Sequence, residues 1–172
     1  CLLASLAMMN RFFGGTLSQD RIGYEIYKGR QPGPEWDLNL AVIQPANVDA
    51  AYAFALGASS ASTWVPPGNK EQLWTVVTTL LDNNIPVLAI RTTSPAHAFV
   101  IVGYDIVGGK RYVVVNDPWH AMQIVYPVDV VASPVAAWTW SRARWPRAWP
   151  SGCRLRWWSR TWRGPPAPSG SR

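Results

Sequence analysis

Three residues that lie far apart in the chain carry side chains which together could perform nucleophilic catalysis. Cys1 precedes an apolar segment of helical length, His97 begins a run of strand-forming residues, and Asp117 ends another such run. A thiol at the start of a helix lies near the positive end of the helix dipole, which favours the thiolate. An imidazole can accept the thiol proton, and a carboxylate can orient the imidazole. These residue types therefore predict a Cys-His-Asp triad if the fold brings them together.

The strands that carry His97 and Asp117 are predicted to form a hairpin. Gly108 and Gly109 separate the two runs, and both accept the positive φ that a tight hairpin turn requires. Folding about this turn pairs residues whose numbers sum to 217, so Asp117 would face Val100 rather than His97. The two side chains would then lie at the same end of the hairpin, but about three residues, or ~10 Å, out of register. A loop of slightly different length, or a β-bulge in one strand, would close that gap.

The first 134 residues predict helices followed by an antiparallel sheet. Residues 2–13 are apolar on nearly every side, so a helix there has to be buried, and Gly14 and Gly15 end it. A second clear helix is expected after Asn69, which has the N-cap position before a 3.6-residue apolar period. Strand-length runs follow at residues 85–91, 97–105 and 111–116, with a fourth at 122–125. Helices first and an antiparallel sheet afterwards indicate the α+β class.

Charge and tryptophan are distributed unevenly along the chain. All ten acidic residues lie at or before Asp129, whereas residues 135–172 hold eight of the sixteen basic residues and seven of the eleven tryptophans. The basic residues of this segment are all arginine, and it has neither a helical nor a strand period. We therefore predict a folded domain over residues 1–134 and a tail over residues 135–172 that is disordered or out-of-frame coding sequence.

The composition also bears on partners and location. Arginine with interleaved tryptophan can bind nucleic acid or an anionic membrane surface. The same composition is what GC-rich coding sequence gives when it is read out of frame, so we expect no nucleic-acid partner. No apolar run reaches the ~18 residues of a membrane span. Two cysteines and two histidines far apart in the sequence make a weak case for a metal site. The compartment cannot be read from the sequence, since no targeting segment precedes Cys1.

Three segments resemble papain-like cysteine peptidases of the bacteriocin-processing, double-glycine type. Residues 1–8 are similar to the helix that begins with the catalytic cysteine, and residues 97–105 to the strand that begins with the catalytic histidine. Residues 115–119, Val-Asn-Asp-Pro-Trp, are similar to the turn that follows in this family. The resemblance covers roughly residues 1–130. It implies a papain-like α+β fold, hydrolysis of a peptide or protein substrate through a thioester acyl-enzyme, a bacterial export context, and no metal or other cofactor.

The catalytic residues of that family map onto matching positions of this sequence. The resemblance makes Cys1 the nucleophile, His97 the general base and acid, and Asp117 the group that orients the imidazole. Asn116 is the alternative orienting residue, because an amide has this role in papain. The family also has an oxyanion-hole glutamine shortly before the cysteine, and this sequence begins at Cys1. Since loss of one oxyanion donor typically lowers turnover ~10²–10³-fold, the chain by itself is expected to have weak activity or none.

Other interpretations stay open at this point. The α-amino group of Cys1 could be the base of an N-terminal-nucleophile hydrolase, a class that does not need His97 but normally has two stacked sheets. A non-enzymatic module, whose basic tryptophan-rich tail binds nucleic acid or membrane, is a further alternative. Taken singly, His97 and Asp117 would be structural residues at strand ends. His120 is interpreted as an exposed turn residue, or as a competitor of Asp117 near His97.

Overall fold

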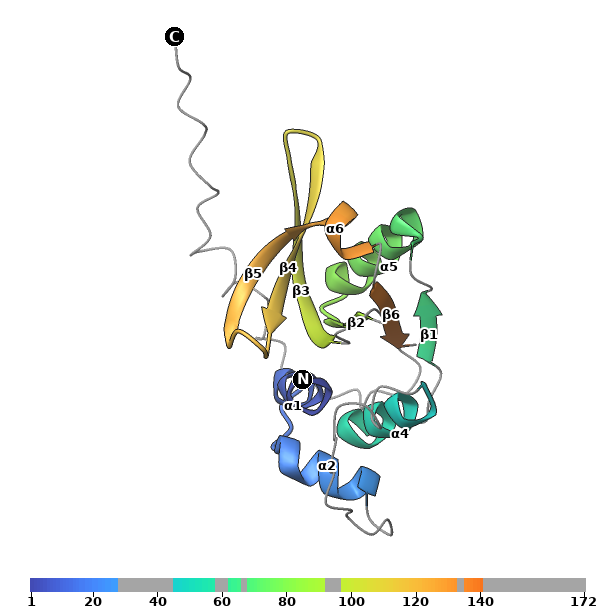
Figure 1. Cartoon of the computed structure of the whole chain (residues 1–172), viewed down its shortest axis with the longest axis vertical. Coiled ribbons are helices and arrows are strands. Elements are labelled where there is room, and N and C mark those ends of the chain that lie inside the picture. Colours follow the sequence, from blue (N-terminus) through green and yellow to red (C-terminus); the bar gives the residue numbers. More distant parts are fainter. Residues whose placement is uncertain (28–44, 58–61, 66–67, 92–96, 133–134, 141–172) are drawn as a thin grey trace.

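The structure is a computed structural model of the chain and describes residues 1–27, 45–57, 62–65, 68–91, 97–132 and 135–140 (Figure 1). The strands form one antiparallel sheet in the order β1-β6-β2-β3-β4-β5. The helices are α1 (Leu2–Phe12), α2 (Gln19–Tyr27), α4 (Pro45–Leu56), α5 (Lys70–Asp82) and α6 (Val128–Ala132). The strands are β1 (Ser62–Val65), β2 (Val87–Arg91), β3 (His97–Val107), β4 (Lys110–Asp117), β5 (Met122–Pro127) and β6 (Val135–Trp140). The predicted α+β class, with the cysteine-bearing helix packed on an antiparallel sheet, is confirmed.

Helices α1, α2 and α4 contribute to a core on one face of the sheet. One side of α1, formed by Leu2, Leu6 and Met9, is fully or almost fully buried, as the apolar composition of this segment predicts. The strand residues in the same core are Leu88, Ile90, Ala98 and Val100. Gly14, with a φ of +80°, follows the end of the helix. This packing holds α1 against β3 and so fixes the position of Cys1 at its start.

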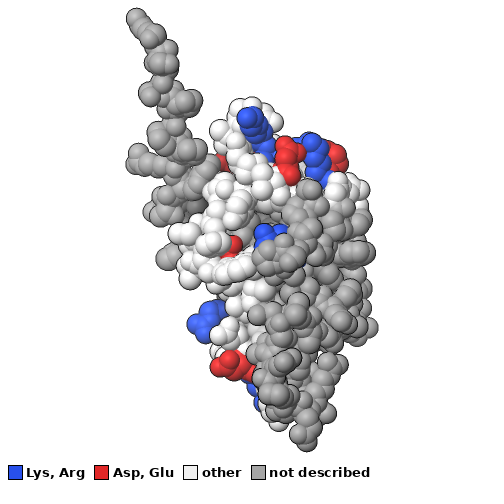
Figure 2. All heavy atoms as spheres, in the orientation of Figure 1, with Lys and Arg blue, Asp and Glu red and all other residues white. Residues whose placement is uncertain are grey.

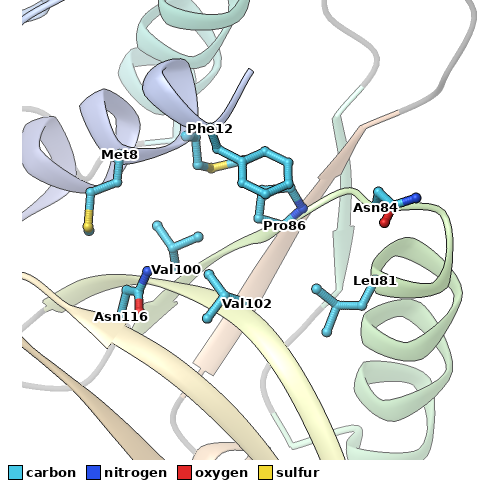
Figure 3. A pocket seen from close by; sticks show the side chains of 9 residues that line it. Met8, Phe12, Leu81, Asn84, Pro86, Val100, Val102 and Asn116 are labelled. Carbon is cyan, nitrogen blue, oxygen red and sulfur yellow. The ribbon is translucent and has the colours of Figure 1, made fainter. Parts of the chain in front are cut away.

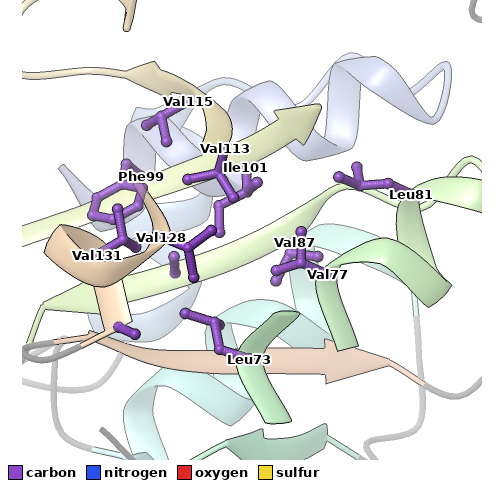
Figure 4. Packing of buried hydrophobic residues seen from close by; sticks show 12 residues of the cluster. Leu73, Val77, Leu81, Val87, Phe99, Ile101, Val113, Val115, Val128 and Val131 are labelled. Carbon is purple, nitrogen blue, oxygen red and sulfur yellow. The ribbon is translucent and has the colours of Figure 1, made fainter. Parts of the chain in front are cut away.

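Helices α5 and α6 pack on the opposite face (Figure 4). Successive residues of a strand point to opposite faces, so Val87, Phe99 and Ile101 turn toward α5 while their neighbours in the sequence turn toward α1. α5 begins after Asn69 as predicted, and Oδ1 of Asn69 accepts a hydrogen bond from the backbone N–H of Gln72 at 3.0 Å. The centre of the sheet, at β2 and the first half of β3, is therefore buried on both faces.

The sheet continues past residue 134, where the sequence analysis places the end of the folded domain. β6 lies inside the sheet, between β1 and β2, and comprises six residues. The boundary is corrected to lie beyond Trp140, because strand pairing uses backbone hydrogen bonds and tolerates the loss of a clear side-chain period. Residues 141–172, the remainder of the predicted tail, lie outside the described residues. No helix in the described part of the chain is long and apolar enough to cross a membrane.

Candidate active site

A β-bulge in β3 determines which side chains face each other at the open end of the β3–β4 hairpin. From the turn as far as the pair Gly103 and Val114, the residue numbers of each β3–β4 pair sum to 217, as predicted. Beyond Val102, which is the extra residue, the sum becomes 216 and Val100 pairs with Asn116. Because the side-chain period of a strand is two, a shift of one residue exchanges the faces that the two strand ends present to each other.

The bulge brings His97 and Asp117 to the same face of the sheet. Without it Asp117 would lie opposite Val100, whose side chain packs in the core on the α1 face. If pairing continues with residue numbers that sum to 216, Asp117 lies opposite Phe99, whose side chain belongs to the core on the other face. His97 is two residues before Phe99 and therefore points to the same face as Phe99. Nε2 of His97 is 2.7 Å from Oδ1 of Asp117, and only 7% and 4% of the two side chains are exposed. The predicted His97 and Asp117 side chains are therefore in direct contact at the end of the hairpin.

The carboxylate of Asp117 accepts three hydrogen bonds. Oδ1 accepts one from Nε2 of His97 and one from the backbone N–H of Trp119, the latter at 2.8 Å. Oδ2 lies 3.0 Å from Nδ1 of His120. His120 thus uses the oxygen that His97 leaves open and does not displace it. The ring centroids of Trp119 and His97 are 4.8 Å apart, so the turn after β4 both anchors the carboxylate and covers the imidazole.

The sulfur of Cys1 lies next to the strand that carries His97. The backbone N–H of Ala98, the residue after His97, donates a hydrogen bond to Sγ of Cys1 at 3.3 Å. Ala98 pairs with Ile90 of β2 and lies before the first β3–β4 pair, Val100 with Asn116. Cys1 is also the N-cap of α1, and its carbonyl oxygen accepts from the backbone N–H of Ser5 at 2.9 Å. The thiol therefore lies beside the backbone of the residue that follows His97, and the imidazole of His97 contacts the carboxylate of Asp117.

Burial and hydrogen bonding shift the protonation of the His97–Asp117 pair. Burial lowers the pKa of His97, and the hydrogen bond and charge of Asp117 offset this only in part, since Arg91 and the chain's amino group lower it too. For Asp117, burial raises the pKa, but hydrogen bonds from both histidines and from a backbone N–H outweigh it and lower the pKa overall. Near neutral pH the pair is therefore an imidazole that can accept a proton, beside a carboxylate.

Asn116, the predicted alternative orienting residue, points to the other face of the sheet. Its Oδ1 accepts a hydrogen bond from Nε2 of Gln123 at 3.1 Å. Its side chain lines a mostly apolar cavity of about 50 Å³ between α1 and the sheet (Figure 3). The other lining residues are Met8, Met9, Phe12, Leu81, Asn84, Pro86, Val100 and Val102. Since neighbouring strand residues face opposite ways, the contact of Asp117 with His97 turns Asn116 away from the imidazole.

Charged side chains of the described residues lie at two ends of the face shown in Figure 2, with a further basic and a further acidic patch near its middle. They gather over the β3–β4 hairpin and α5, and again beside α1 and α2, with both signs at each end. Arg111 of β4 pairs with Glu71 of α5 at 2.7 Å, and Arg21 pairs with Glu25 within α2 at 2.5 Å. Among the described residues, no group of three or more His, Cys, Asp or Glu side chains could hold a metal ion. On this face the described charges form clusters of mixed sign.

The sequence of the chain matches the model of a known protein family. The model of the Peptidase_C39 like family matches residues 1–144, a range that includes Cys1, His97 and Asp117. The chain belongs to this family. No curated protein and no solved structure matches it. The resemblance read from the sequence motifs is confirmed, and the match extends through β6. Membership indicates a cysteine-peptidase kind of function, that is, a hydrolase that acts on protein substrates.

Three contacts of the site were not predicted from the sequence. The N–H of Ala98 on the sulfur is a backbone contact, for which the residue type gives no signal. The contact of Trp119 with the imidazole could have been predicted, because an aromatic residue two positions after Asp117 in a turn can fold back over the strand end. The contact of His120 with Asp117 depends on the conformation of that turn, which the sequence does not specify.

Proposed function

We propose that the chain is a cysteine peptidase that hydrolyses peptide bonds through a triad of Cys1, His97 and Asp117. The observation that carries the proposal is the buried contact of 2.7 Å between Nε2 of His97 and Oδ1 of Asp117. This contact is adjacent to the strand position whose N–H binds the Cys1 sulfur. A nucleophile, a base and an orienting carboxylate in this order are the parts of a catalytic triad. Membership of the Peptidase_C39 like family supports the same kind of reaction.

In the proposed acylation step, Nδ1 of His97 accepts the proton of the Cys1 thiol. The sulfur then forms a bond to the carbonyl carbon of the scissile peptide, and the π electrons of the carbonyl move to its oxygen. When this tetrahedral intermediate collapses, the C–N bond breaks and His97 gives its proton to the leaving amine. The products are a thioester on Cys1 and a peptide fragment with a new amino terminus.

Water completes the proposed cycle. Nδ1 of His97 accepts a proton from a water molecule, whose oxygen forms a bond to the thioester carbonyl carbon. The C–S bond then breaks, and His97 returns the proton to the sulfur of Cys1. The second peptide fragment leaves with a carboxyl terminus. No redox partner is needed, because each step transfers only protons and the acyl group.

In this mechanism Asp117 holds the imidazole in one orientation and one tautomer. The Nε2–H of His97 donates to Asp117, which leaves Nδ1 to exchange protons with the thiol. Burial lowers the pKa of His97, so the ring is neutral and able to accept a proton near pH 7. The N–H of Ala98 and the positive end of α1 favour negative charge on the sulfur.

Hydrolysis of a diverse synthetic peptide library, with the products identified by mass spectrometry, tests this function. Cys1→Ala should abolish cleavage, and His97→Ala should reduce it nearly as far, because the members of a triad act as a unit. For the same reason the double variant should be little slower than either single variant. Cys153→Ala changes the chain's other cysteine and is the matched control, which should cleave the library at the rate of the unsubstituted chain.

Two results would contradict the proposal. Unchanged cleavage after Cys1→Ala would show that the sulfur is not the nucleophile. Full activity in His97→Ala would show that another group is the base, and would favour the α-amino group of Cys1 in the manner of an N-terminal-nucleophile hydrolase.

A further inference from the structure

The second oxygen of the Asp117 carboxylate has a partner of its own. Oδ1 accepts from His97 and from the Trp119 backbone, whereas Oδ2 lies 3.0 Å from Nδ1 of His120. Asp117 is 4% exposed, and 55% of the His120 side chain is exposed, so His120 approaches the buried carboxylate from the solvent side. We propose that His120 is a positioning residue, which fixes the plane of the Asp117 carboxylate and thereby the orientation of His97. The proposal rests on the function proposed above, in which Asp117 orients the imidazole.

A carboxylate in this position needs an anchor on each oxygen. The last torsion of an aspartate side chain is broad and roughly two-fold, so without a partner on Oδ2 only the two hydrogen bonds to Oδ1 oppose rotation of the carboxylate about that torsion. Rotation would move Oδ1 off the Nε2–H of His97 and weaken a hydrogen bond that depends on alignment. The contact of His120 with Oδ2 opposes this rotation. His120 therefore acts on the imidazole through Asp117 and does not touch the reacting atoms.

The turn that carries His120 is shaped to direct it at Asp117. The two residues are three positions apart, and β5 begins two residues after His120. Ala121 lies between His120 and the start of β5 and has a φ of +50°, in the left-handed region that residues with a Cβ atom rarely adopt. Such a conformation persists where the surrounding contacts hold it. The backbone therefore leaves its usual range next to His120, where the turn has to bring the imidazole back to the strand end.

The donor on His120 is the same in both of its common protonation states. The carboxylate of Asp117 only accepts hydrogen bonds, so Nδ1 of His120 has to carry a proton. Nδ1–H is present in the protonated ring and in one neutral tautomer. Positioning by His120 therefore does not require a charged ring, and an uncharged donor at the position of Nδ1 should replace it. The amide nitrogen of asparagine is at the corresponding distance along the side chain, whereas that of glutamine is one bond farther.

Three substitutions of His120 distinguish a role as hydrogen-bond donor to Asp117 from a role of its size or its polarity. His120→Ala removes the donor, His120→Asn keeps a donor near the position of Nδ1, and His120→Gln keeps an amide but displaces it. We expect His120→Ala to lower kcat about 10- to 100-fold with little change in KM, by analogy with partners that orient metal-bound histidines, whose loss has effects of this size. His120→Asn should restore kcat to within a few-fold of the unsubstituted chain, and His120→Gln should restore it less.

A titration of His97 provides a readout that needs no substrate. The chain has two histidines, so ¹³Cε1-labelled histidine gives two NMR signals, and any His120 variant leaves only that of His97. The measurement uses a Cys1→Ala background, so that no thiolate titrates beside the ring. Asp117 raises the pKa of His97, while burial, Arg91 and the chain's amino group lower it. If the carboxylate rotates away in His120→Ala, His97 should therefore titrate at lower pH than in the unsubstituted chain, and in His120→Asn it should not.

The outcomes distinguish this proposal from the proposed function. A shifted His97 titration in His120→Ala that His120→Asn reverses supports positioning, even if no peptide in the library is cleaved. An unchanged titration and an unchanged kcat in His120→Ala would overturn it. A loss in His120→Asn as large as in His120→Ala would also overturn it, because the ring would then act by its bulk and not as a donor. Far-UV circular dichroism of each variant verifies that the fold is retained.

Discussion

Replacement of Asp117 by asparagine separates the charge of the carboxylate from its geometry. Two donors, Nε2–H of His97 and the backbone N–H of Trp119, converge on Oδ1, and one donor, on His120, reaches Oδ2. An asparagine amide satisfies the two convergent donors when its oxygen is at the Oδ1 position. Its NH₂ group then meets His120, which is half-exposed and can become the acceptor by changing tautomer. We therefore expect Asp117→Asn to keep His97 oriented.

The magnitude follows from the hydrogen bonds that change. A hydrogen bond to a charged group contributes ~1.5–3 kcal/mol and one between neutral groups ~0.5–1.5 kcal/mol, so the bond to His97 should weaken by about 1–1.5 kcal/mol. Expressed entirely in the transition state, that difference lowers kcat about ten-fold. Asp117→Ala removes the acceptor altogether, and loss of the orienting carboxylate in comparable triads lowers kcat on the order of 10⁴-fold.

Stability provides the second readout for the same pair of variants. Asp117→Ala leaves the donors on His97 and Trp119 without their acceptor, at a cost of about 2–4 kcal/mol. For a chain of this size the melting temperature should fall by about 5–15 °C, whereas Asp117→Asn should lower it by only a few degrees. Kinetics on a cleaved library peptide and thermal melting by circular dichroism measure both effects. The reasoning would be refuted if Asp117→Asn lost as much activity as Asp117→Ala at unchanged stability.

Three further predictions concern stability. Asn69→Ala should lower the free energy of unfolding by ~0.5–2 kcal/mol in urea titrations, because α5 loses its side-chain N-cap. Ser5→Ala should be neutral or stabilising in the same assay, since the buried Oγ of Ser5 has no hydrogen-bond partner among the described residues; a loss above ~1 kcal/mol would contradict this. The melting temperature should fall as the pH drops below about 6.5, because the lowered pKa of His97 means that the unfolded chain binds its proton first, and His97→Gln should remove this fall. A second fall should follow below pH 3.8, because the lowered pKa of Asp117 stabilises the folded chain only while its carboxylate is ionised.

The hairpin illustrates how far the sequence predicts this site. Gly108 and Gly109 predicted the turn, and both have positive φ, +56° and +76°. The pairing sum of 217 was correct for the half of the hairpin near the turn. A bulge was one of two predicted ways to close the gap, but its position was not predicted, because Val102 is β-branched and apolar like the two residues before it. Gly103, next to it, was the available signal, since an isolated glycine in a strand often accompanies a bulge.

Other features depend on backbone geometry that residue types do not determine. β6 joins the sheet through main-chain pairing, and a segment with an abrupt change in composition can still form a central strand. The turn in which His120 approaches Asp117 includes the left-handed conformation of Ala121, for which alanine has no intrinsic preference. By contrast, α1 and α5 follow from periodicity and capping, which are local properties of the chain and so were predicted from it.

The central claim, that Cys1 and His97 act as a pair, is tested most directly by the alkylation rate of Cys1 with iodoacetamide. Peptide mapping by mass spectrometry measures that rate at pH 6 and separates Cys1 from Cys153 in the same sample. Iodoacetamide reacts with the thiolate, so Cys1 should react faster in the folded chain than in denaturant, and His97→Ala should slow it about ten-fold or more without changing Cys153. Equal rates at Cys1 in the unsubstituted chain and in His97→Ala would contradict the account.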